Sequence, residues 1–506
     1  MRSKKAVMNS IMALLAQITS IICGFILPRL ILSHFGSSYN GITSSITQFI
    51  SCVVLLRAGI GSVTRAALYK PLSEQNIYEI SGIVNATERY MKRIAMIFAG
   101  TLIVFAGIYP LAVAKEFDWW FSFSLVLILG ISTFAQNYFG ITYQMLIQAD
   151  QCQYIYSLLT IITTIVNTIV ASILISMDCS IHIVKLGSAI VFAINPIVLN
   201  LYVKKKYNID KSVPINNNAI SQRWDAFAQQ AAAFVNNNTD VMVLTIFSTM
   251  KEVSVYTVYY LVANGLYKVE YTICESIEAA FGNMIAKGEK DVLDENVKLV
   301  EFLMFFTAAF LFICGGVLIV PFVQVYTKGV TDVSYTRPFF GILICINQFL
   351  ACVRLPYQML VEAAGHFKQT RNGAIFEAIM NIVISVVLVI KFGLIGVAIG
   401  TACALIFRTL QYAIYASKNI LQRNIMVVIK RLVISVLEAI TVFLIIKWIP
   451  DIYVGSYFMW AIYAIIVAIV VAIVLLIYST IFFRKEEKQL IIKINSAMSK
   501  LLKRSK

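Results

Sequence analysis

The chain has 506 residues, of which 59% are hydrophobic and only 13% are charged. Soluble domains carry about 25% charged residues, so this composition excludes an ordinary soluble protein. A formal net charge of +16 would suit a nucleic-acid partner. The excess lysine and arginine falls in loops at one predicted membrane face, however, which excludes that interpretation.

Apolar runs of about 20 residues predict an all-α polytopic membrane protein, because such a run spans a bilayer as a helix. The runs do not alternate in polarity, as the strands of a membrane β-barrel do. About fourteen spans are expected, at residues 7–33, 41–63, 91–114, 119–147, 154–176, 183–203, 225–248, 253–282, 297–320, 338–363, 372–391, 393–415, 431–449 and 457–483. The runs 225–248 and 253–282 are unusually polar for spans. The turn Lys391–Gly393 is short enough to join its two neighbours into one helix.

Lysine and arginine are distributed unevenly between the two sets of loops. With the N-terminus in the cytoplasm, the inner segments carry 30 of these residues and the outer loops carry six. Both termini are therefore expected in the cytoplasm. The tail 484–506 places its apolar residues on one helical face, which predicts an amphipathic helix on the anionic inner leaflet. Docking to a partner protein is the alternative for this tail.

An internal repeat organises the first twelve predicted helices. Tyr143–Ala149 (YQMLIQA) recurs as Tyr357–Ala363 (YQMLVEA), and three further matches occur in the same order in both halves at a nearly constant offset along the chain. Six helices per repeat give both copies the same orientation, which is the parallel arrangement of two transporter lobes. The expected parts are an N-lobe of helices 1–6, a cytoplasmic linker, a C-lobe of helices 7–12, helices 13–14 and a basic tail, at residues 1–210, 211–224, 225–415, 416–483 and 484–506.

Ionisable side chains at membrane depth are costly and tend to face a cavity, so each one is a candidate functional residue. Five basic residues in predicted spans are candidates for binding an anionic headgroup such as a pyrophosphate: Arg29, Arg57, Lys268, Arg354 and Arg408. Snorkelling toward the surface is the alternative for Arg29 and the expectation for Glu377. An ion pair with Glu438 is the alternative for Arg354 or Arg408.

A second set of candidates is polar or acidic and is expected to line a water-filled lumen, where it contacts sugar hydroxyls or binds a proton or sodium ion. These residues are Asn236, Asn237, Asn238, Asp240, Glu270 and Glu438. Packing of amides between helices is the alternative for the asparagines. No nucleophile elbow, zinc-protease motif or P-loop is found, and the cysteines and histidines lack metal-ligand spacing. Neither an enzyme nor a bound metal or cofactor is expected.

Three groups of short patterns carry a family resemblance. They are Leu27–Leu32 with His34–Gly36 and Asn40–Gly41, then Leu56–Gly61 with Tyr69–Leu72, and finally Thr239–Leu244. With them the whole chain resembles the polysaccharide-transporter (Wzx-like) branch of the multidrug/oligosaccharidyl-lipid/polysaccharide (MOP) flippase superfamily. The resemblance implies a MATE/MOP-like fold in a bacterial or archaeal plasma membrane. It also implies a cationic lumen in which arginines on helices 1, 2 and 8 receive a pyrophosphate, and Arg29, Arg57 and Lys268 lie on those helices here.

The function implied by the resemblance is transport by alternating access. A flippase of this kind moves undecaprenyl-pyrophosphate-linked oligosaccharide from the inner to the outer leaflet, for capsule, O-antigen or cell-wall polymers. It is expected to act as a monomer or in loose association with other polysaccharide-assembly proteins. A multidrug or cation antiporter of the same fold is the first alternative, although helix 1 carries no acid. A membrane polymerase or glycosyltransferase of the same pathway is the second, and the short loops argue against it.

Overall fold

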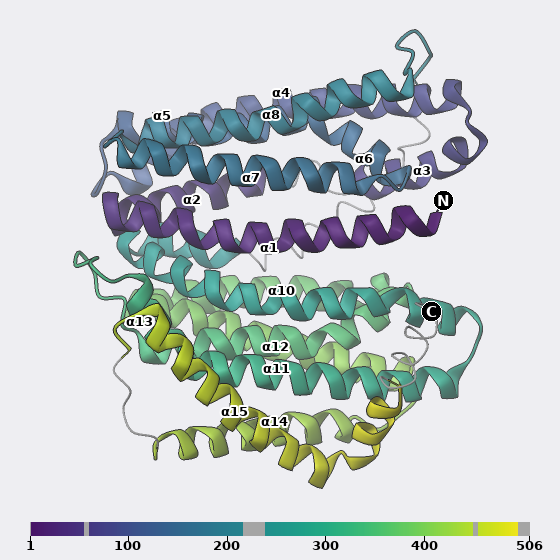
Figure 1. The fold of residues 1–506 in the computed structure, drawn as a ribbon, viewed down its shortest axis with the longest axis vertical. Helices are drawn as coiled ribbons and strands as arrows, with labels where there is room; N and C mark the ends of the chain where they lie inside the picture. The colour runs from purple at the N-terminus through teal and green to yellow at the C-terminus, as the bar shows by residue number, and fades with distance from the viewer. Residues whose placement is uncertain (1, 55–59, 216–237, 449–453, 494–506) are drawn as a thin grey trace. The chain divides into compact units, whose positions relative to one another are not determined.

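The computed structural model describes residues 2–54, 60–215, 238–448 and 454–493. Within these ranges the chain is helical apart from short connections, as the sequence predicts (Figure 1). Nine of the described helices are long and apolar enough to cross a membrane. The protein is therefore a multi-pass α-helical membrane protein. Most of the predicted span 225–248 and part of 41–63 lie outside the described residues.

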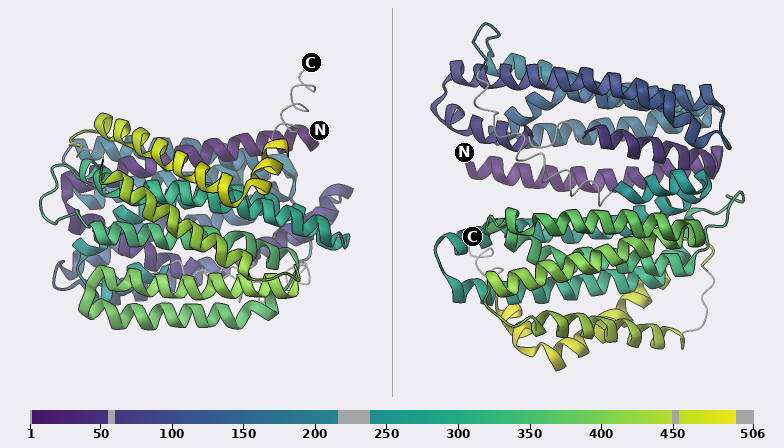
Figure 2. Two further views of the ribbon diagram at one scale, coloured as in Figure 1. Left: turned by 90° about the horizontal axis from the view of Figure 1, so that it is seen from below. Right: turned by 180° about the vertical axis from the view of Figure 1, so that it is seen from behind.

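The described chain forms two compact units, which divide after Thr257. The first unit contains the residues up to Thr257 together with Gly329–Val333. Its helices are α1 (Arg2–Phe35), α2 (Ser37–Val54), α3 (Ile60–Glu74), α4 (Ile77–Val113), α5 (Trp119–Ala135), the π-helical turn η2 (Gln136–Gly140), α6 (Ile141–Ala149), α7 (Gln153–Ser176) and α8 (Ile181–Tyr207). Helices α4, α5, α8, α7 and α1 pack on one another in that order (Figures 1 and 2).

The second unit contains Val258–Lys328 and Ser334–Lys506. Its helices are most of α10 (Met250–Ala286), then α11 (Lys290–Tyr326), α12 (Pro338–Ala363), α13 (Phe367–Asn419), α14 (Met426–Ile446) and α15 (Tyr457–Phe482). Helix α12 packs on α11 and α13, and α15 packs on α11 and α14. The lobe limits at residues 210 and 225 that the repeat suggests remain predictions.

The helix bounds reproduce the internal repeat. Helices α4 and α11 each have 37 residues. Their first residues, Ile77 and Lys290, are therefore separated along the chain by the same offset as their last residues, Val113 and Tyr326. Their buried faces agree in register at this offset, because Met91 and Ala95 of α4 correspond to Met304 and Ala308 of α11 and all four are buried. The beginnings of α2 and α10 are separated by the same offset. This confirms the prediction of two parallel repeats followed by two additional helices.

Helix α13 is interrupted at the short turn for which the sequence left two interpretations. Gly393 has φ +54° and ψ −129°, a backbone conformation that a residue with a Cβ adopts only at a cost. Residues 367–392 and 394–419 are therefore two helical segments joined at a kink. This arrangement agrees with two separate spans.

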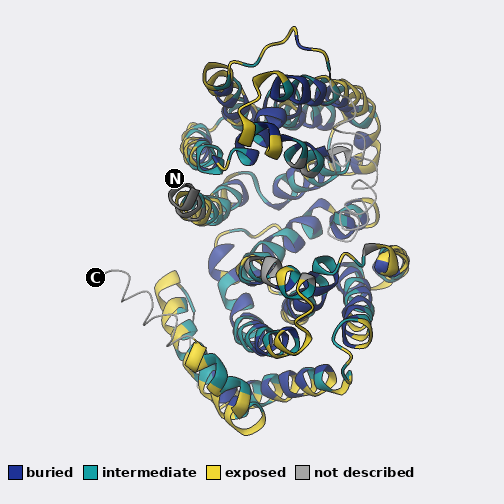
Figure 3. Cartoon of the chain, turned by 90° about the vertical axis from the view of Figure 1, so that its right-hand side faces the viewer, coloured by how far each residue is buried: buried dark blue, intermediate teal, exposed yellow. Residues whose placement is uncertain are grey.

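In each unit the helices turn buried residues toward one another and exposed residues outward (Figure 3). Many of the exposed residues are large and apolar, among them Ile103, Leu111, Ile390 and Ile473. Exposure of so many large apolar side chains would be unfavourable in water. In a bilayer they form the surface that contacts the lipid acyl chains.

The described start of the C-terminal tail, residues 484–493, is helical and packs on the second unit. Gln489 donates a hydrogen bond to Glu295 at 2.9 Å, and Lys493 donates one to Asn296 at 2.8 Å. These contacts bind the tail to the beginning of α11, which the sequence did not predict. Contact of the tail with the inner leaflet stays a prediction.

Candidate functional site

Three of the charged residues meet inside the second unit. Arg354 of α12 and Arg408 of α13 both bind Glu377 of α13, with Arg354 Nη1 3.0 Å from Oε1 and Arg408 Nε 3.3 Å from Oε2. Arg408 also donates to the carbonyl oxygen of Thr370 at 3.0 Å and to the hydroxyl of Tyr412 at 2.7 Å. We call Arg354, Glu377 and Arg408 the arginine–glutamate cluster.

The arginine–glutamate cluster corrects two expectations. Glu377 does not snorkel, because its relative exposure is 3% and it holds both guanidinium groups. The ion-pair partner of Arg354 and Arg408 is Glu377, not Glu438. Buried charges are tolerated only when they are paired, so an anionic ligand at these arginines would have to compete with Glu377.

Glu270 of α10 is completely buried, with a relative exposure of 0%. It lies beside Thr307 of α11. In the part of the chain that the structure describes, no basic side chain forms an ion pair with it. Lys268, two residues earlier on the same helix, is exposed. A lone carboxylate in an apolar interior is unfavourable until it binds a proton or a cation.

Glu438 of α14 lines a small cavity between α11, α14 and α15. The cavity has a volume of about 20 Å³ and is lined by Phe302, Phe305 and Ser479 among others. A space of this size holds about one water molecule. It is too small for a sugar, so we do not propose a sugar contact for Glu438.

The remaining candidates lie in the first unit or outside the described residues. Arg29 lies in the second half of α1 and is half-buried. Asp240 accepts a hydrogen bond from the Tyr256 hydroxyl at 2.8 Å, and Asn238 accepts one from Gln48. Asn238 therefore pairs with another amide between helices, which was the alternative for the asparagines. The residues that the structure does not describe are Arg57, Asn236 and Asn237.

The first unit also contains a row of polar contacts that sequence reasoning missed, and its residues are buried except for one exposed aspartate at its end. These contacts join α2 to three segments of the second repeat, namely the short helix Asn238–Phe247, the start of α10 and the connection between α11 and α12. Isolated small polar residues in apolar helices show no periodic pattern in the sequence. Their contacts therefore could not be predicted until the fold was known. We call the row the polar seam, and its residues are Ser37, Asn40, Ser45, Thr245, Ser254 and Asp332.

The polar seam is well satisfied by hydrogen bonds. The N–H and hydroxyl of Ser37 donate to the two carboxylate oxygens of Asp332 at 2.8 and 2.7 Å. The hydroxyl oxygens of Ser45 and Thr245 are 2.7 Å apart. Ser45 also accepts a hydrogen bond from the Tyr109 hydroxyl at 2.9 Å. Hydrogen bonds of this kind favour one register of the packed helices.

Gly41 allows the close approach along the seam. A Cβ at this position would lie 1.8 Å from the carbonyl oxygen of Met250. Overpacking of a buried contact costs about 1–3 kcal/mol, so Gly41→Ala is expected to lower the melting temperature of the purified protein. Gly107→Ala is the matched control, because a Cβ there meets no atom within 4 Å. Equal melting temperatures for the two variants would contradict the close approach.

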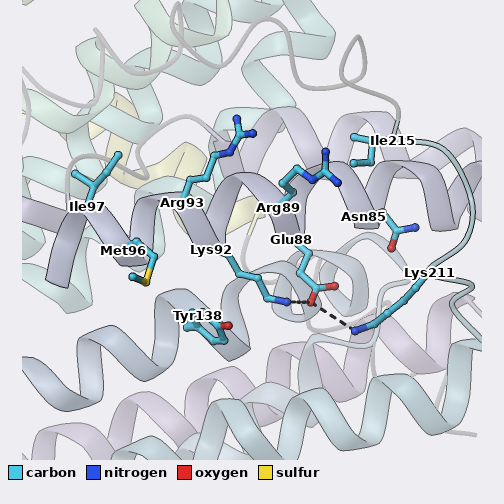
Figure 4. Close-up of a pocket in the computed structure, with 10 residues that line it drawn as sticks. All are labelled: Asn85, Glu88, Arg89, Lys92, Arg93, Met96, Ile97, Tyr138, Lys211 and Ile215. Atoms are coloured by element: carbon cyan, nitrogen blue, oxygen red, sulfur yellow. Dashed lines mark ion pairs between the residues drawn. The ribbon is translucent and has the colours of Figure 1, made fainter. Parts of the chain in front are cut away.

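A basic pocket opens beside the first half of α4, and we call it the α4 pocket (Figure 4). Its volume is about 690 Å³, and four cationic side chains line it: Arg89, Lys92, Arg93 and Lys211. Sequence reasoning missed it because these residues were counted only among the topogenic charges of inner loops. Their proximity depends on how α4 and the loop after α8 fold together.

Glu88 is the acid of the α4 pocket. Its Oε1 lies 2.7 Å from Lys92 Nζ and 4.0 Å from Lys211 Nζ. Its Oε2 accepts a hydrogen bond from the Tyr143 hydroxyl at 3.3 Å. Lys92 also lies over the ring of Tyr138, 5.4 Å from its centroid. The carboxylate is therefore already occupied by side chains of the protein.

The loop that carries Lys211 is held by side-chain hydrogen bonds. Asn85 of α4 donates to the carbonyl oxygens of Asp210 at 2.9 Å and Val213 at 3.3 Å. The N–H and hydroxyl of Ser212 both donate to Asp210 Oδ1, at 2.8 and 2.7 Å, and they lower the pKa of this exposed carboxyl. The loop thus forms a defined wall of the pocket.

Comparison with known proteins identifies the fold. A scan against protein-family models finds no match, and a search of curated proteins finds none either. The chain is similar to the lipid II flippase MurJ in an inward closed conformation, with 17% identity and a TM-score of 0.70 over 94% of this chain and 99% of that one.

Two further solved structures share the fold. An inward-facing multidrug resistance MATE family transporter of the MOP superfamily has 12% identity and a TM-score of 0.55 over 79% of this chain and 95% of that one. The Vibrio cholerae MATE transporter VcmN has 14% identity and a TM-score of 0.55 over 84% of this chain and 99% of that one. The chain thus shares its fold with the lipid II flippase and with the MATE transporters.

Proposed function

We propose that this protein is a flippase that moves a lipid-linked oligosaccharide from the inner to the outer leaflet for polysaccharide biosynthesis. The observation that carries the proposal is the likeness to the lipid II flippase, which extends over 94% of the chain. The fold of two parallel repeats supports alternating access. The additional helices α14 and α15 distinguish the chain from a protein made of the two repeats alone.

The polar seam and the buried charges suggest how such a flippase operates. The charge distribution predicts that the seam lies near the outer face, where we propose that it opens when the protein faces outward. Arg29, Lys268 and Arg57 remain candidates for receiving the diphosphate of the substrate. We further propose that Glu270 binds the proton or sodium ion that couples transport to an ion gradient.

The proposed function is tested by deleting the gene and measuring lipid-linked sugar in each leaflet. Loss of the flippase is expected to accumulate lipid-linked oligosaccharide in the inner leaflet and to reduce surface polymer. Unchanged lipid pools with normal surface polymer would contradict the proposal.

A multidrug antiporter is the competing function, and the MATE-type fold is compatible with it. Helix α1 (Arg2–Phe35) contains no aspartate or glutamate that would meet a cationic drug, which favours the flippase. Overexpression with a panel of cationic drugs separates the two functions. A broad rise in drug resistance would support the antiporter.

The role of Glu270 leads to a prediction. Glu270→Gln removes the ionisable group and keeps the size of the side chain. Flipping by this variant in proteoliposomes is expected to lose its dependence on pH and sodium gradients, while the protein still purifies as a folded species. Glu295→Gln, at a surface contact with Gln489, is the control. A gradient dependence equal to that of the wild type would exclude Glu270 as the coupling group.

A further inference from the structure

Two arginines of the α4 pocket, Arg89 and Arg93, lie one helical turn apart and are exposed. Among the residues that the structure describes, no carboxylate is within ion-pair distance of either. Figure 4 shows Lys92 and Lys211 directed toward Glu88, whereas Arg89 and Arg93 extend away from it. The described lining of the pocket thus combines four cations with one carboxylate that is already bound.

Comparison with the second repeat shows which residues of the α4 pocket belong to the fold that both repeats share. The pair Glu88–Tyr143 recurs in the second repeat, at offsets that differ by one residue, as Glu301–Tyr357, where the tyrosine again lies near the glutamate. The glutamate–tyrosine pair therefore belongs to the shared architecture of the repeats.

The neighbours of this pair differ between the repeats. At the offset that relates α4 to α11, the basic residues Arg89, Lys92 and Arg93 are replaced by Phe302, Phe305 and Phe306. In the second unit these phenylalanines are covered by α14 and α15, which share a cavity lining with them. The counter-charges of Glu301 come from α14 and the residues before it, as Arg431 and Arg423. The fold therefore needs a cation for the glutamate but not a cluster of cations on this helix face.

From this contrast we propose that the α4 pocket binds the diphosphate of an isoprenoid lipid. This proposal deepens and rests on the proposed function, since it assigns a capture site for the substrate at the predicted cytoplasmic end of α4. Guanidinium groups bind phosphate oxygens with two parallel hydrogen bonds, and lysine adds a point charge. The exposed Met96 and Ile97 lie on the same helix, beyond Arg93, and offer an apolar wall to the first isoprene units. The volume of about 690 Å³ lies within the range usual for small-molecule sites.

The test measures binding to the purified full-length protein in lipid nanodiscs. The probe is farnesyl diphosphate, and farnesyl monophosphate, inorganic pyrophosphate and phosphatidylglycerol vesicles are the competitors. Arg89→Gln/Arg93→Gln is expected to raise the Kd for farnesyl diphosphate by about tenfold or more, because two charge-assisted contacts are lost. Lys204→Gln/Lys205→Gln, at the exposed end of α8, removes the same charge and should change Kd by less than about twofold. A photoreactive farnesyl diphosphate should attach near Tyr138 or Met96.

Three results would overturn the proposal. They are an equal effect of the two double variants, no measurable binding by the wild type, and equal competition by phosphatidylglycerol vesicles, which would indicate a general anionic surface. Inorganic pyrophosphate competing as well as the farnesyl compound would remove the isoprenoid part of the assignment. Binding at the pocket with unchanged lipid pools in the deletion strain would refute the flippase function while the site stands. Accumulated lipid pools without binding would refute the site alone.

Discussion

Replacing Glu377 by glutamine should destabilise the protein by about 3–5 kcal/mol, because it leaves two buried arginines without their shared counter-charge. Arg408 is 4% exposed and its Nε contacts Glu377 Oε2 directly. Arg354 reaches the other oxygen of the same carboxylate. The variant is expected to yield little monodisperse protein, with a markedly lower melting temperature in detergent.

Two comparisons make this prediction specific. Glu362→Gln removes a carboxylate at the end of α12 that contacts Gln358 and should cost at most about 1 kcal/mol. Replacing Arg354, Glu377 and Arg408 together by Met, Leu and Met should recover much of the stability, since apolar substitutes for a buried ionic cluster are often tolerated. A wild-type melting temperature for Glu377→Gln would show that the arginine–glutamate cluster does not form.

Locking the polar seam should abolish transport. The hydroxyl oxygens of Ser45 and Thr245 lie 2.7 Å apart, so the variant Ser45→Cys/Thr245→Cys brings two thiols within reach of a disulfide. Oxidation is expected to cross-link the two helices and reduce flipping to background. Reduction with dithiothreitol should restore it. The readout is flipping of a labelled lipid-linked oligosaccharide before and after reduction.

The single variants Ser45→Cys and Thr245→Cys control for loss of the hydroxyl groups. Each should keep most of the flipping activity under oxidising conditions. If the cross-linked protein flips at the wild-type rate, the seam does not have to open and the proposed outer gate is wrong.

Much of the fold was predictable because its causes are local or repeated along the chain. Apolar runs set the helices, and the nearly constant offset between matching segments reveals the two repeats before any contact is known. The break at Gly393 was visible as a short turn, although only its positive φ decides between one helix and two. These features depend on the bilayer thickness and on backbone sterics, which a sequence reports directly.

The site was less predictable, because its residues are selected by tertiary contacts. The sequence singled out Arg354 and Arg408, and its alternative for either of them was an ion pair with Glu438. That alternative is wrong in its partner, because Glu438 lies on α14 against the phenylalanines of α11, and Glu377 lies between the arginines. Arg89 and Arg93 were visible only as loop charges, since their meaning depends on which carboxylates the folded chain brings near them. Such pairings are not determined by spacing along a chain.

The most direct test of the account is flipping by the purified protein in proteoliposomes. A labelled undecaprenyl-diphosphate-linked oligosaccharide is placed in both leaflets, and its exposure to an impermeant quencher is followed with time. The account predicts that the wild-type protein transfers the lipid between leaflets much faster than protein-free vesicles, and that the oxidised Ser45→Cys/Thr245→Cys variant does not. Equal rates in vesicles with and without the wild-type protein would contradict it.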